Sequence, residues 1–246
     1  MGRFTGRVAI VTGSSSGIGE AVARRLAAEG ARVVVNSVTS TEAGERLAAE
    51  LPDAVYVQAD VSDEAACAGL VRAAVDRYGG LDLLVNNAGW TQVIAHGDLD
   101  AVTDQVWRRI LDTNVLGAWY MTRAAVPALR DAEDGNVVNV SSVAGVRPSG
   151  SSIPYAVSKA ALNHMTRLLA SALGPDVRVN AVAPGLIATP WTEDWDAIHA
   201  YVAERAPLRR SGRPDDVAEV CLGLAMSRYV TGEVVVVDGG VHLLVG

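Results

Sequence analysis

Short runs of branched apolar residues recur along this chain, and most of them are separated by segments with a helical pattern. The runs are Val8–Val11, Val33–Val35, Val55–Val57, Leu81–Val85, Val137–Val140, Val177–Val182 and Val234–Val237. Continuous runs of this kind are typical of parallel strands covered on both faces. Amphipathic patterns predict a helix after Gly17 and helices over about Thr41–Leu51, Asp63–Tyr78, Thr103–Leu129, Tyr155–Leu173 and Pro214–Met226. The alternation predicts a single Rossmann-type α/β domain over residues 1–246, with a doubly wound seven-stranded parallel sheet and helices on both faces.

The composition argues against several other classes of protein. A formal net charge of −7 does not provide the basic face that a general nucleic-acid binder needs. No apolar run approaches the roughly 20 residues that cross a bilayer, and the first residues contain no signal-peptide core. Cys67 and Cys221 show no metal-binding spacing. We therefore expect a cytoplasmic protein that uses no metal and has no nucleic-acid or membrane partner.

One segment, residues 187–210, does not fit the alternation of strands and helices. It lies between the sixth and seventh predicted strands and carries Trp191, Trp195, His199 and Tyr201. Long connections in compact domains are usually functional or mobile. We predict that this segment is a substrate-binding lid within the domain.

The first predicted strand leads directly into a glycine-rich turn that opens a helix. Its spacing is Gly13-x3-Gly17-x-Gly19, without the Lys-Ser/Thr ending of an ATP-binding loop. Glycines here let the backbone turn tightly and approach a pyrophosphate, whose charge faces the first amides of the helix. The turn therefore predicts a nucleotide site. Residues 13–17 also match the nucleophile elbow of hydrolases, but only twelve residues precede them and no histidine is an evident partner.

Ser142, Tyr155 and Lys159 form the second informative group. Tyr155 and Lys159 are four residues apart on a predicted helix and therefore share one face. A neighbouring ammonium lowers the pKa of a phenol from its usual value of about 10, so that the phenol exchanges protons near neutral pH. Ser142 ends the fifth predicted strand, at the edge where open α/β sheets bind ligands. A Tyr-x3-Lys pair alone is usually only surface, but this combination indicates a catalytic site.

In these motifs the chain resembles the classical short-chain dehydrogenase/reductase family, in its branch of 3-oxoacyl-carrier-protein reductases and sugar dehydrogenases. The resemblance covers essentially the whole chain. Beyond the groups above it includes Asp60-Val61, Asn86-Asn87-Ala88-Gly89, Asn114 in Thr113–Val115, Pro184-Gly185-Leu186-Ile187-x-Thr189 and Val237–Gly240. The stretch Leu224–Gly232 is a few residues shorter than is usual in the family, which leaves its geometry and one subunit contact open.

The resemblance implies an NAD(P)-dependent oxidoreductase that transfers a hydride between a nicotinamide and a carbonyl or secondary alcohol. Tyr155 then passes the proton, Ser142 orients the oxygen, and Lys159 tunes the phenol and binds the nicotinamide ribose. Asn114 completes the implied tetrad by holding a water that links Lys159 to solvent. The implied cofactor-binding residues are Gly13, Ser15, Ser16, Gly17, Ile18, Gly19, Asn36, Ser37, Asp60, Val61, Asn87, Ala88, Gly89, Tyr155, Lys159, Pro184, Gly185, Ile187 and Thr189. The family also implies a homotetramer, for which we expect apolar surface on Trp119, Tyr120 and Met121.

The end of the second strand bears on the choice between NAD and NADP. An acidic residue at this position binds the ribose hydroxyls of NAD and repels the 2′-phosphate of NADP. Asn36 and Ser37 stand here instead, and their amide and hydroxyl groups are able to bond a phosphate. Ser16, however, occupies a position where many NADP-dependent members carry a basic residue. We predict NADP in preference to NAD.

The sequence leaves three functions open on this fold, because fold does not fix function. They are a reductase or dehydrogenase, a non-catalytic regulatory protein that binds nicotinamide nucleotides, and an epimerase or dehydratase that uses the cofactor transiently. Asn114 also has a structural alternative, which is to kink its helix. The predicted substrate walls are Trp90–Ile94, Val143–Ser151 and Ile187–Tyr201. The sequence does not specify the substrate, and it leaves open a 3-oxoacyl thioester, a sugar, a steroid-like or polyketide carbonyl and a small secondary alcohol.

Overall fold

The strands form one parallel sheet in the computed structural model, which describes residues 2–244. They are β1 (Val8–Val11), β2 (Arg32–Ser37), β3 (Ala54–Gln58), β4 (Leu83–Asn86), β5 (Gly135–Val140), β6 (Val177–Pro184) and β7 (Val234–Val237). Their order is β3-β2-β1-β4-β5-β6-β7, and every neighbouring pair is parallel. The predicted seven-stranded, doubly wound sheet is confirmed. The order reverses between β1 and β4, where open α/β sheets bind ligands at the carboxyl ends of their strands.

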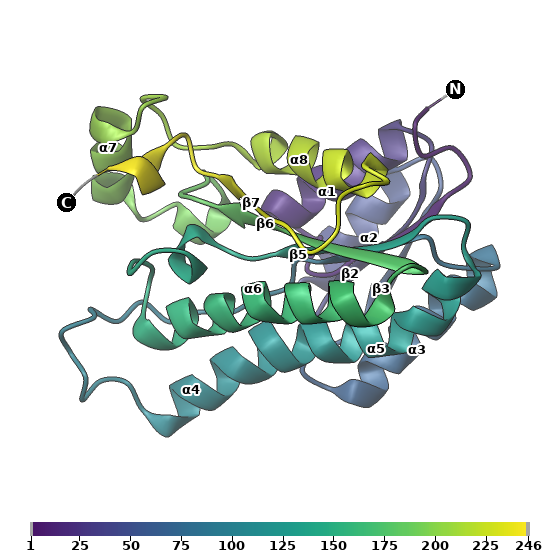
Figure 1. Cartoon of the computed structure of the whole chain (residues 1–246), viewed down its shortest axis with the longest axis horizontal. Coiled ribbons are helices and arrows are strands. Elements are labelled where there is room, and N and C mark those ends of the chain that lie inside the picture. Colours follow the sequence, from purple (N-terminus) through teal and green to yellow (C-terminus); the bar gives the residue numbers. More distant parts are fainter. Residues whose placement is uncertain (1, 245–246) are drawn as a thin grey trace.

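Helices cover both faces of the sheet (Figure 1). They are α1 (Gly17–Ala28), α2 (Thr41–Glu50), α3 (Glu64–Tyr78), α4 (Asp104–Leu111), α5 (Gly117–Asp131), α6 (Ile153–Leu173), α7 (Asp196–Arg205) and α8 (Pro214–Met226). Buried side chains of α1, α2 and α8 pack with one face of the sheet, and those of α3, α5 and α6 pack with the other. These two apolar layers fix the sheet between them, so that the strand ends have defined positions.

One predicted helix is interrupted. The pattern over Thr103–Leu129 predicts a single helix, but the structure has a π-helical turn at Asp112–Leu116 between α4 and α5. Such a turn contains one surplus residue and often lies at a functional site. Asn114 lies in it and is buried. Asn114 therefore lies where its helix departs from regular α-helical geometry, as its structural alternative predicts.

Residues 187–210 form an excursion from the sheet. They contain a 3-10 turn at Pro190–Thr192 and the helix α7. Figure 1 shows α7 away from the two helical layers, at the same end of the molecule as the last described residues. His199 on α7 bonds Ser211 Oγ through Nδ1 at 2.7 Å and the Thr192 carbonyl oxygen through Nε2 at 3.1 Å. His199 therefore holds α7 to the 3-10 turn before it and to Ser211 after it.

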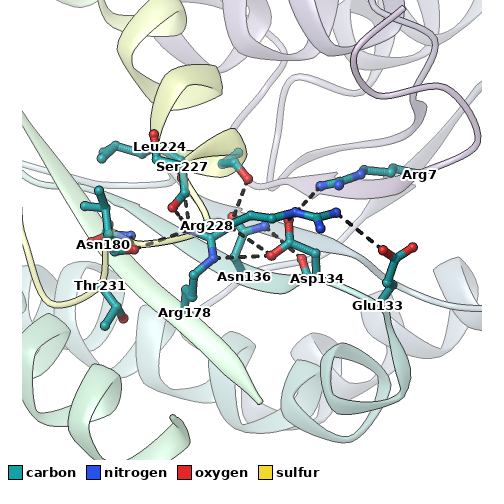
Figure 2. Close-up of polar contacts among 12 residues, drawn as sticks. Arg7, Glu133, Asp134, Asn136, Arg178, Asn180, Leu224, Ser227, Arg228 and Thr231 are labelled. Carbon is teal, nitrogen blue, oxygen red and sulfur yellow. Dashed lines mark hydrogen bonds and ion pairs between the residues drawn. The ribbon is translucent and has the colours of Figure 1, made fainter. Parts of the chain in front are cut away.

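The short connection after α8 is held by Arg178 at the amino-terminal end of β6 (Figure 2). The Arg178 guanidinium donates to the backbone carbonyls of Leu224, Ala225 and Ser227 at 2.9 to 3.1 Å. The same guanidinium pairs with Asp134 at 3.3 Å, and that carboxylate also pairs with Arg7 and Arg228. The shortened stretch Leu224–Gly232 thus has a defined geometry. The network lies at the end of the sheet opposite the ligand-binding edge.

Both cysteines lie inside the protein, on α3 and α8. Cys67 and Cys221 are both free and buried. Burial raises the pKa of each thiol to about 12, so neither forms a thiolate near neutral pH.

Among the helices of residues 2–244, none combines the length and the apolar character that spanning a membrane demands.

Candidate active site

The carboxyl ends of the strands open into one cavity of about 1830 Å³. Most of the predicted site residues line it, and they come from the glycine turn, from the ends of five strands and from helix α6. Those on the wall are Gly13, Ser15, Ser16, Gly17, Ile18, Asn36, Ser37, Asp60, Val61, Asn87, Ala88, Gly89, Ser142, Tyr155, Lys159, Pro184, Gly185, Ile187 and Thr189. Gly19 and Asn114 do not line the cavity, and their contacts explain why.

The glycine turn has little room for side chains. Gly13 and Gly17 have φ values of +60° and +59°, a region that strongly favours glycine. A Cβ on Gly13 would lie 2.9 Å from the Cα of Ala88. A Cβ on Gly19 would lie 2.5 Å from both Asn87 Nδ2 and the Gly13 carbonyl oxygen. Gly19 therefore brings α1 against the loop after β4 and does not form part of the cavity wall.

The first turn of α1 remains open to a ligand. Ser16 precedes the helix and makes no side-chain cap. The first amide groups of a helix lack partners within the helix and carry partial positive charge. Because Ser16, Gly17 and Ile18 also line the cavity, this end of α1 is suited to hold a phosphate group.

Asn87 braces the turn from behind. Its Nδ2 donates to the carbonyl oxygens of Thr12 and Gly13, both at 2.9 Å. The backbone amides of Asn87 and Ala88 each donate to Thr12 Oγ1 at 3.0 Å. The side chain of Asn87 is therefore a support for the glycine turn, while its remaining atoms lie on the cavity wall.

The amide of Asn36 is also engaged within the protein. Its Oδ1 accepts from the Gly13 amide at 3.2 Å, and its Nδ2 donates to the carbonyl oxygens of Val57 and Ala59 at 3.1 Å. The expectation that this amide is available to a phosphate is wrong, because the register of β2 against β3 turns it inward. The hydroxyl-bearing residues Ser37, Thr39 and Ser40 also line the cavity here, and the Ser37 hydroxyl is bonded to the Tyr56 hydroxyl at 2.9 Å.

Helix α6 carries Tyr155 and Lys159, and it is joined to the loop that carries Ser142. Ser142 lies two residues beyond the end of β5, not within the strand, and its Oγ accepts from the Ala144 amide at 3.1 Å. Ser141 Oγ donates to the Lys159 carbonyl oxygen at 3.2 Å, and Asn163 Nδ2 donates to the Gly145 carbonyl oxygen at 3.1 Å. These bonds fix Ser142 relative to the helix.

Burial dominates the ionisation of the two central groups. The Lys159 Nζ donates to the Val140 carbonyl oxygen at 2.9 Å and lies 5.7 Å from the centre of the Tyr155 ring. Burial lowers the pKa of Lys159 from 10.5 to about 8. Burial raises the pKa of the Tyr155 phenol, and a hydrogen bond with Ser142 acts in the opposite direction. The pKa of the phenol is therefore raised and not lowered as expected, and it is the Ser142 hydrogen bond, not the ammonium, that opposes the effect of burial.

Asn114 connects the cavity wall to helix α6, which carries Tyr155 and Lys159. Its Oδ1 accepts from the Trp90 amide at 2.7 Å, and its Nδ2 donates to the Trp90 carbonyl oxygen at 3.0 Å. The same Nδ2 donates to Ser158 Oγ at 3.0 Å, and Ser158 Oγ donates to the Tyr155 carbonyl oxygen at 2.7 Å. Sequence reasoning missed Ser158 and Trp90 as partners, although Ser158 stands directly before Lys159.

All three predicted walls contribute to the cavity. Its apolar lining includes Trp90, Val93, Ile94, Val143, Ala144, Pro148, Trp191, Trp195, Ile198 and Tyr201. Sequence reasoning missed a fourth wall on α4, formed by Gln105, Arg108, Arg109 and Asp112. Their spacing of i, i+3, i+4 and i+7 is the signal that one helix face turns toward the cavity.

Comparison with known proteins decides the family. A family profile described as Enoyl-(Acyl carrier protein) reductase matches residues 13–242. The chain is 62% identical over 240 residues to a Streptomyces violaceoruber protein named as ketoacyl reductase 2 of the granaticin polyketide synthase, covering 96% of each chain. It is 39% identical over 247 residues to a Thermotoga maritima 3-oxoacyl-(acyl-carrier-protein) reductase, covering 97% of this chain and 98% of the relative. A solved Brucella melitensis structure, described as a short-chain dehydrogenase/reductase of the glucose/ribitol dehydrogenase type, aligns with a TM-score of 0.92 at 33% identity and covers 98% of each chain.

The chain belongs to the short-chain dehydrogenase/reductase family. A short-chain dehydrogenase/reductase is an oxidoreductase that acts on C=O or CH–OH groups with a nicotinamide cofactor. The residues present fit that cofactor, because the glycine turn, the free first turn of α1 and the cavity form one continuous surface. A side chain on Gly13 would press on the Ala88 backbone across this surface.

Proposed function

We propose that this protein is an NADP(H)-preferring ketone reductase in which Ser142, Tyr155, Lys159 and Asn114 act together. The observation that carries the proposal is that Ser142, Tyr155 and Lys159 line the same cavity as the glycine turn. A regulatory protein that only bound the nucleotide would need neither a buried amine nor a hydroxyl pair on that wall.

The nucleotide is held at the glycine turn after β1 and at the end of β2. The first amides of α1 and the glycine turn bind the pyrophosphate. Ser37, Thr39 and Ser40 line the cavity beside the end of β2 and would offer hydroxyl groups to a 2′-phosphate, and no acidic side chain at the end of β2 would repel it. When bound, the nicotinamide supplies the hydride in the reduction or accepts it in the reverse reaction.

The protein's own residues handle the proton and the oxygen. Because burial raises the pKa of Tyr155, the phenol holds its proton at neutral pH and is a proton donor to the carbonyl oxygen. Ser142 donates a hydrogen bond to that oxygen as negative charge develops on it. The positive charge of Lys159 stabilises the phenolate left after proton transfer. Asn114 acts through its bonds to Trp90 and Ser158 and keeps the wall and α6 in register.

The proposed substrate class is a 3-oxoacyl or polyketide chain bound as a thioester to a carrier. Two relatives support this class by their names, which are a ketoacyl reductase of a polyketide synthase and a 3-oxoacyl-(acyl-carrier-protein) reductase. The wide apolar wall with Trp191, Trp195 and Tyr201 accommodates a bulky chain. Residues 187–210 then act as the lid over it.

The proposal includes a homotetramer in the cytoplasm, as in the family. Exposed apolar side chains on the long helices support the assembly, and they include Trp119 on α5 and Val157 and Leu168 on α6. Met121 does not contribute, because it is fully buried in the core.

Oxidation of NADPH over a panel of ketones tests the proposal. The panel contains 3-oxoacyl thioesters, a cyclic ketone and a sugar ketone, and the absorbance of the reduced nicotinamide is followed. We expect turnover with the 3-oxoacyl thioesters and a lower kcat/KM with NADH than with NADPH. Binding of NADPH without turnover of any ketone would overturn the enzyme in favour of a regulatory protein.

A further inference from the structure

One face of α4 is turned toward the cavity and carries two arginines. Arg108 and Arg109 line the cavity, while Val106 and Ile110 on the opposite face are buried in the core. We infer that Arg108 and Arg109 bind the phosphate group of the arm that carries the substrate thioester. The inference rests on the proposed function and extends it to a binding site on α4.

Arg109 is held in a fixed orientation. Its guanidinium carbon lies 4.0 Å from the centre of the Trp90 ring, a close cation–π contact. Trp90 is in turn fixed through both of its backbone groups by Asn114. Stacking occupies the face of the guanidinium and leaves its N–H edge available, and that edge matches the oxygens of a phosphate.

The two arginines lack partners of their own. Within residues 2–244, neither guanidinium forms a hydrogen bond or an ion pair. Asp112 is one turn away and lines the same cavity, yet it pairs with neither of them. Some other exposed arginines are paired, Arg24 with Glu20 and Glu50 and Arg210 with Asp216, whereas others such as Arg72 and Arg167 have no partner among the described residues. Arg108 and Arg109 differ from all of these because they line the cavity. In a chain with a net charge of −7, two adjacent unpaired cations beside the cavity form a site for an anion.

The position of the pair favours a phosphate at the mouth of the cavity over a carboxylate close to the reacting carbonyl. Both arginines are exposed, so the group they bind continues into solvent. The opposite wall comes from the 3-10 turn at Pro190–Thr192 and from α7 and is aromatic. Figure 1 shows α4 and α7 on opposite sides of one end of the molecule. An acyl chain against the aromatic wall thus leaves its phosphate-bearing arm on the side of α4.

Binding of a matched pair of ligands tests the inference. Pantetheine and 4′-phosphopantetheine differ only in the phosphate. Both are titrated calorimetrically into the NADP⁺-loaded protein at low ionic strength. We expect the phosphorylated ligand to bind about tenfold more tightly or better, because charge-assisted bonds to a guanidinium are worth that much. Equal affinities in the wild-type protein would overturn the inference without any variant.

Variants then assign the effect to α4. In the double variant Arg108→Gln/Arg109→Gln we expect the two ligands to bind equally. Arg72→Gln serves as the matched control, because Arg72 is an exposed arginine on α3 that does not line the cavity. Arg109→Lys keeps the charge but loses the stacked fork, and we expect an intermediate preference. A phosphate preference that persists in the double variant would place the site elsewhere and refute the assignment.

Two further arms identify the source of the phosphate and separate this inference from the proposed function. The titration is repeated with coenzyme A and with an acyl carrier protein that bears phosphopantetheine. If coenzyme A and the carrier both bind more tightly than pantetheine, the protein recognises the phosphate-bearing arm itself. If the affinity rises more with the carrier than with coenzyme A, the carrier is the source of the phosphate. Ketone reduction is measured separately. Turnover without a phosphate preference sinks the α4 site alone, whereas a phosphate preference without turnover sinks the proposed function alone.

Discussion

The Nδ2 of Asn114 lies 3.0 Å from Ser158 Oγ and bonds the Trp90 carbonyl oxygen at the same distance. Asn114 therefore joins a residue of the substrate wall to the helix that carries Tyr155 and Lys159. Ser158 completes the link, because its hydroxyl passes a bond to the Tyr155 carbonyl oxygen. All these atoms are buried or partly buried, so each bond that is lost leaves a polar group without water.

Ser158→Ala is expected to disturb catalysis from outside the cavity. The change leaves one N–H of Asn114 without its partner, at a cost of about 1–3 kcal/mol in folding free energy. We expect kcat for ketone reduction to fall by about tenfold, with little change in the affinity for NADPH. A double-mutant cycle with Asn114→Ala measures the link directly. Additive effects in the cycle would contradict it.

Tyr155→Phe removes the proposed proton donor and leaves the ring in place. We expect turnover to fall by about a hundredfold or more, while the affinity for NADPH and the thermal unfolding midpoint stay near those of the wild type. Stopped-flow measurement of NADPH oxidation and a fluorescence titration of the cofactor check the two parts. Near-normal turnover would remove Tyr155 from the mechanism.

Lys159 is the only lysine in the chain. Lysine labelled with ¹³C at Cε therefore gives a single side-chain resonance, and its chemical shift follows one ionisation. We expect a midpoint near pH 8, because burial lowers the pKa to about 8. A midpoint above pH 10 would show that the amine is solvated in solution.

The lowered pKa of Lys159 also makes the free energy of unfolding depend on pH. The pKa of Lys159 is about 8 in the folded protein and 10.5 as its ordinary value. Between these values the unfolded chain binds more protons, so the free energy of unfolding rises with pH over this window. Relative to Lys159→Met, the wild type is expected to gain about 3 kcal/mol between pH 8 and 10.5. Chemical denaturation of both proteins across the window measures the difference, and a parallel pH dependence would contradict it.

Ser37→Asp is expected to move the cofactor preference toward NAD. Ser37 ends β2, lines the cavity and bonds the Tyr56 hydroxyl at 2.9 Å. The new charge repels a 2′-phosphate and accepts ribose hydroxyls. The ratio of kcat/KM for NADPH to that for NADH should fall by about tenfold or more.

Asn36→Asp is the matched comparison for that change. It introduces the same charge one residue earlier, but against the carbonyl oxygens of Val57 and Ala59. We expect a loss of stability of about 2 kcal/mol or more, since an unpaired buried charge faces two acceptors. If Asn36→Asp switched the cofactor and Ser37→Asp did not, the assignment of the discriminating position would be reversed.

Arg178→Ala is expected to act on stability alone. It removes three bonds to the end of α8 and leaves Asp134 without its most buried partner. We expect the free energy of unfolding to fall by about 3 kcal/mol. Because the network lies at the end of the sheet away from the cavity, kcat and KM should be unchanged at a temperature where the variant is folded. A changed KM would mean that the two ends of the sheet are coupled.

The strands could be predicted from the sequence because each one contains a short Val- or Leu-rich apolar run. β1 and β7 coincide with Val8–Val11 and Val234–Val237, and the parallel order follows from the helices between the runs. The motif residues around the glycine turn, Ser142 and Tyr155 could also be assigned to one edge, since parallel strands end on the same side.

What the sequence could not reveal depends on contacts between distant segments. The interruption at Asp112–Leu116 accompanies bonds from Asn114 to residues 24 and 44 positions away, and no local pattern records them. The inward turn of Asn36 depends on the register of β2 against β3. Met121 was expected at the surface together with Trp119 and Tyr120, as apolar surface for the assembly that the family implies, yet it faces the core.

The surplus residue at Asp112–Leu116 also determines which arginines of the preceding helix line the cavity. One residue corresponds to about 100° of rotation around a helix axis. Removing it would rewind the segment into a continuous coil and swing the preceding side chains, Arg108 and Arg109 among them, away from the substrate entrance. Because Asn114 lies in the same turn, such a deletion would also break its bonds to Trp90 and Ser158, so the two arginines and the support of α6 depend on one irregularity of the helix.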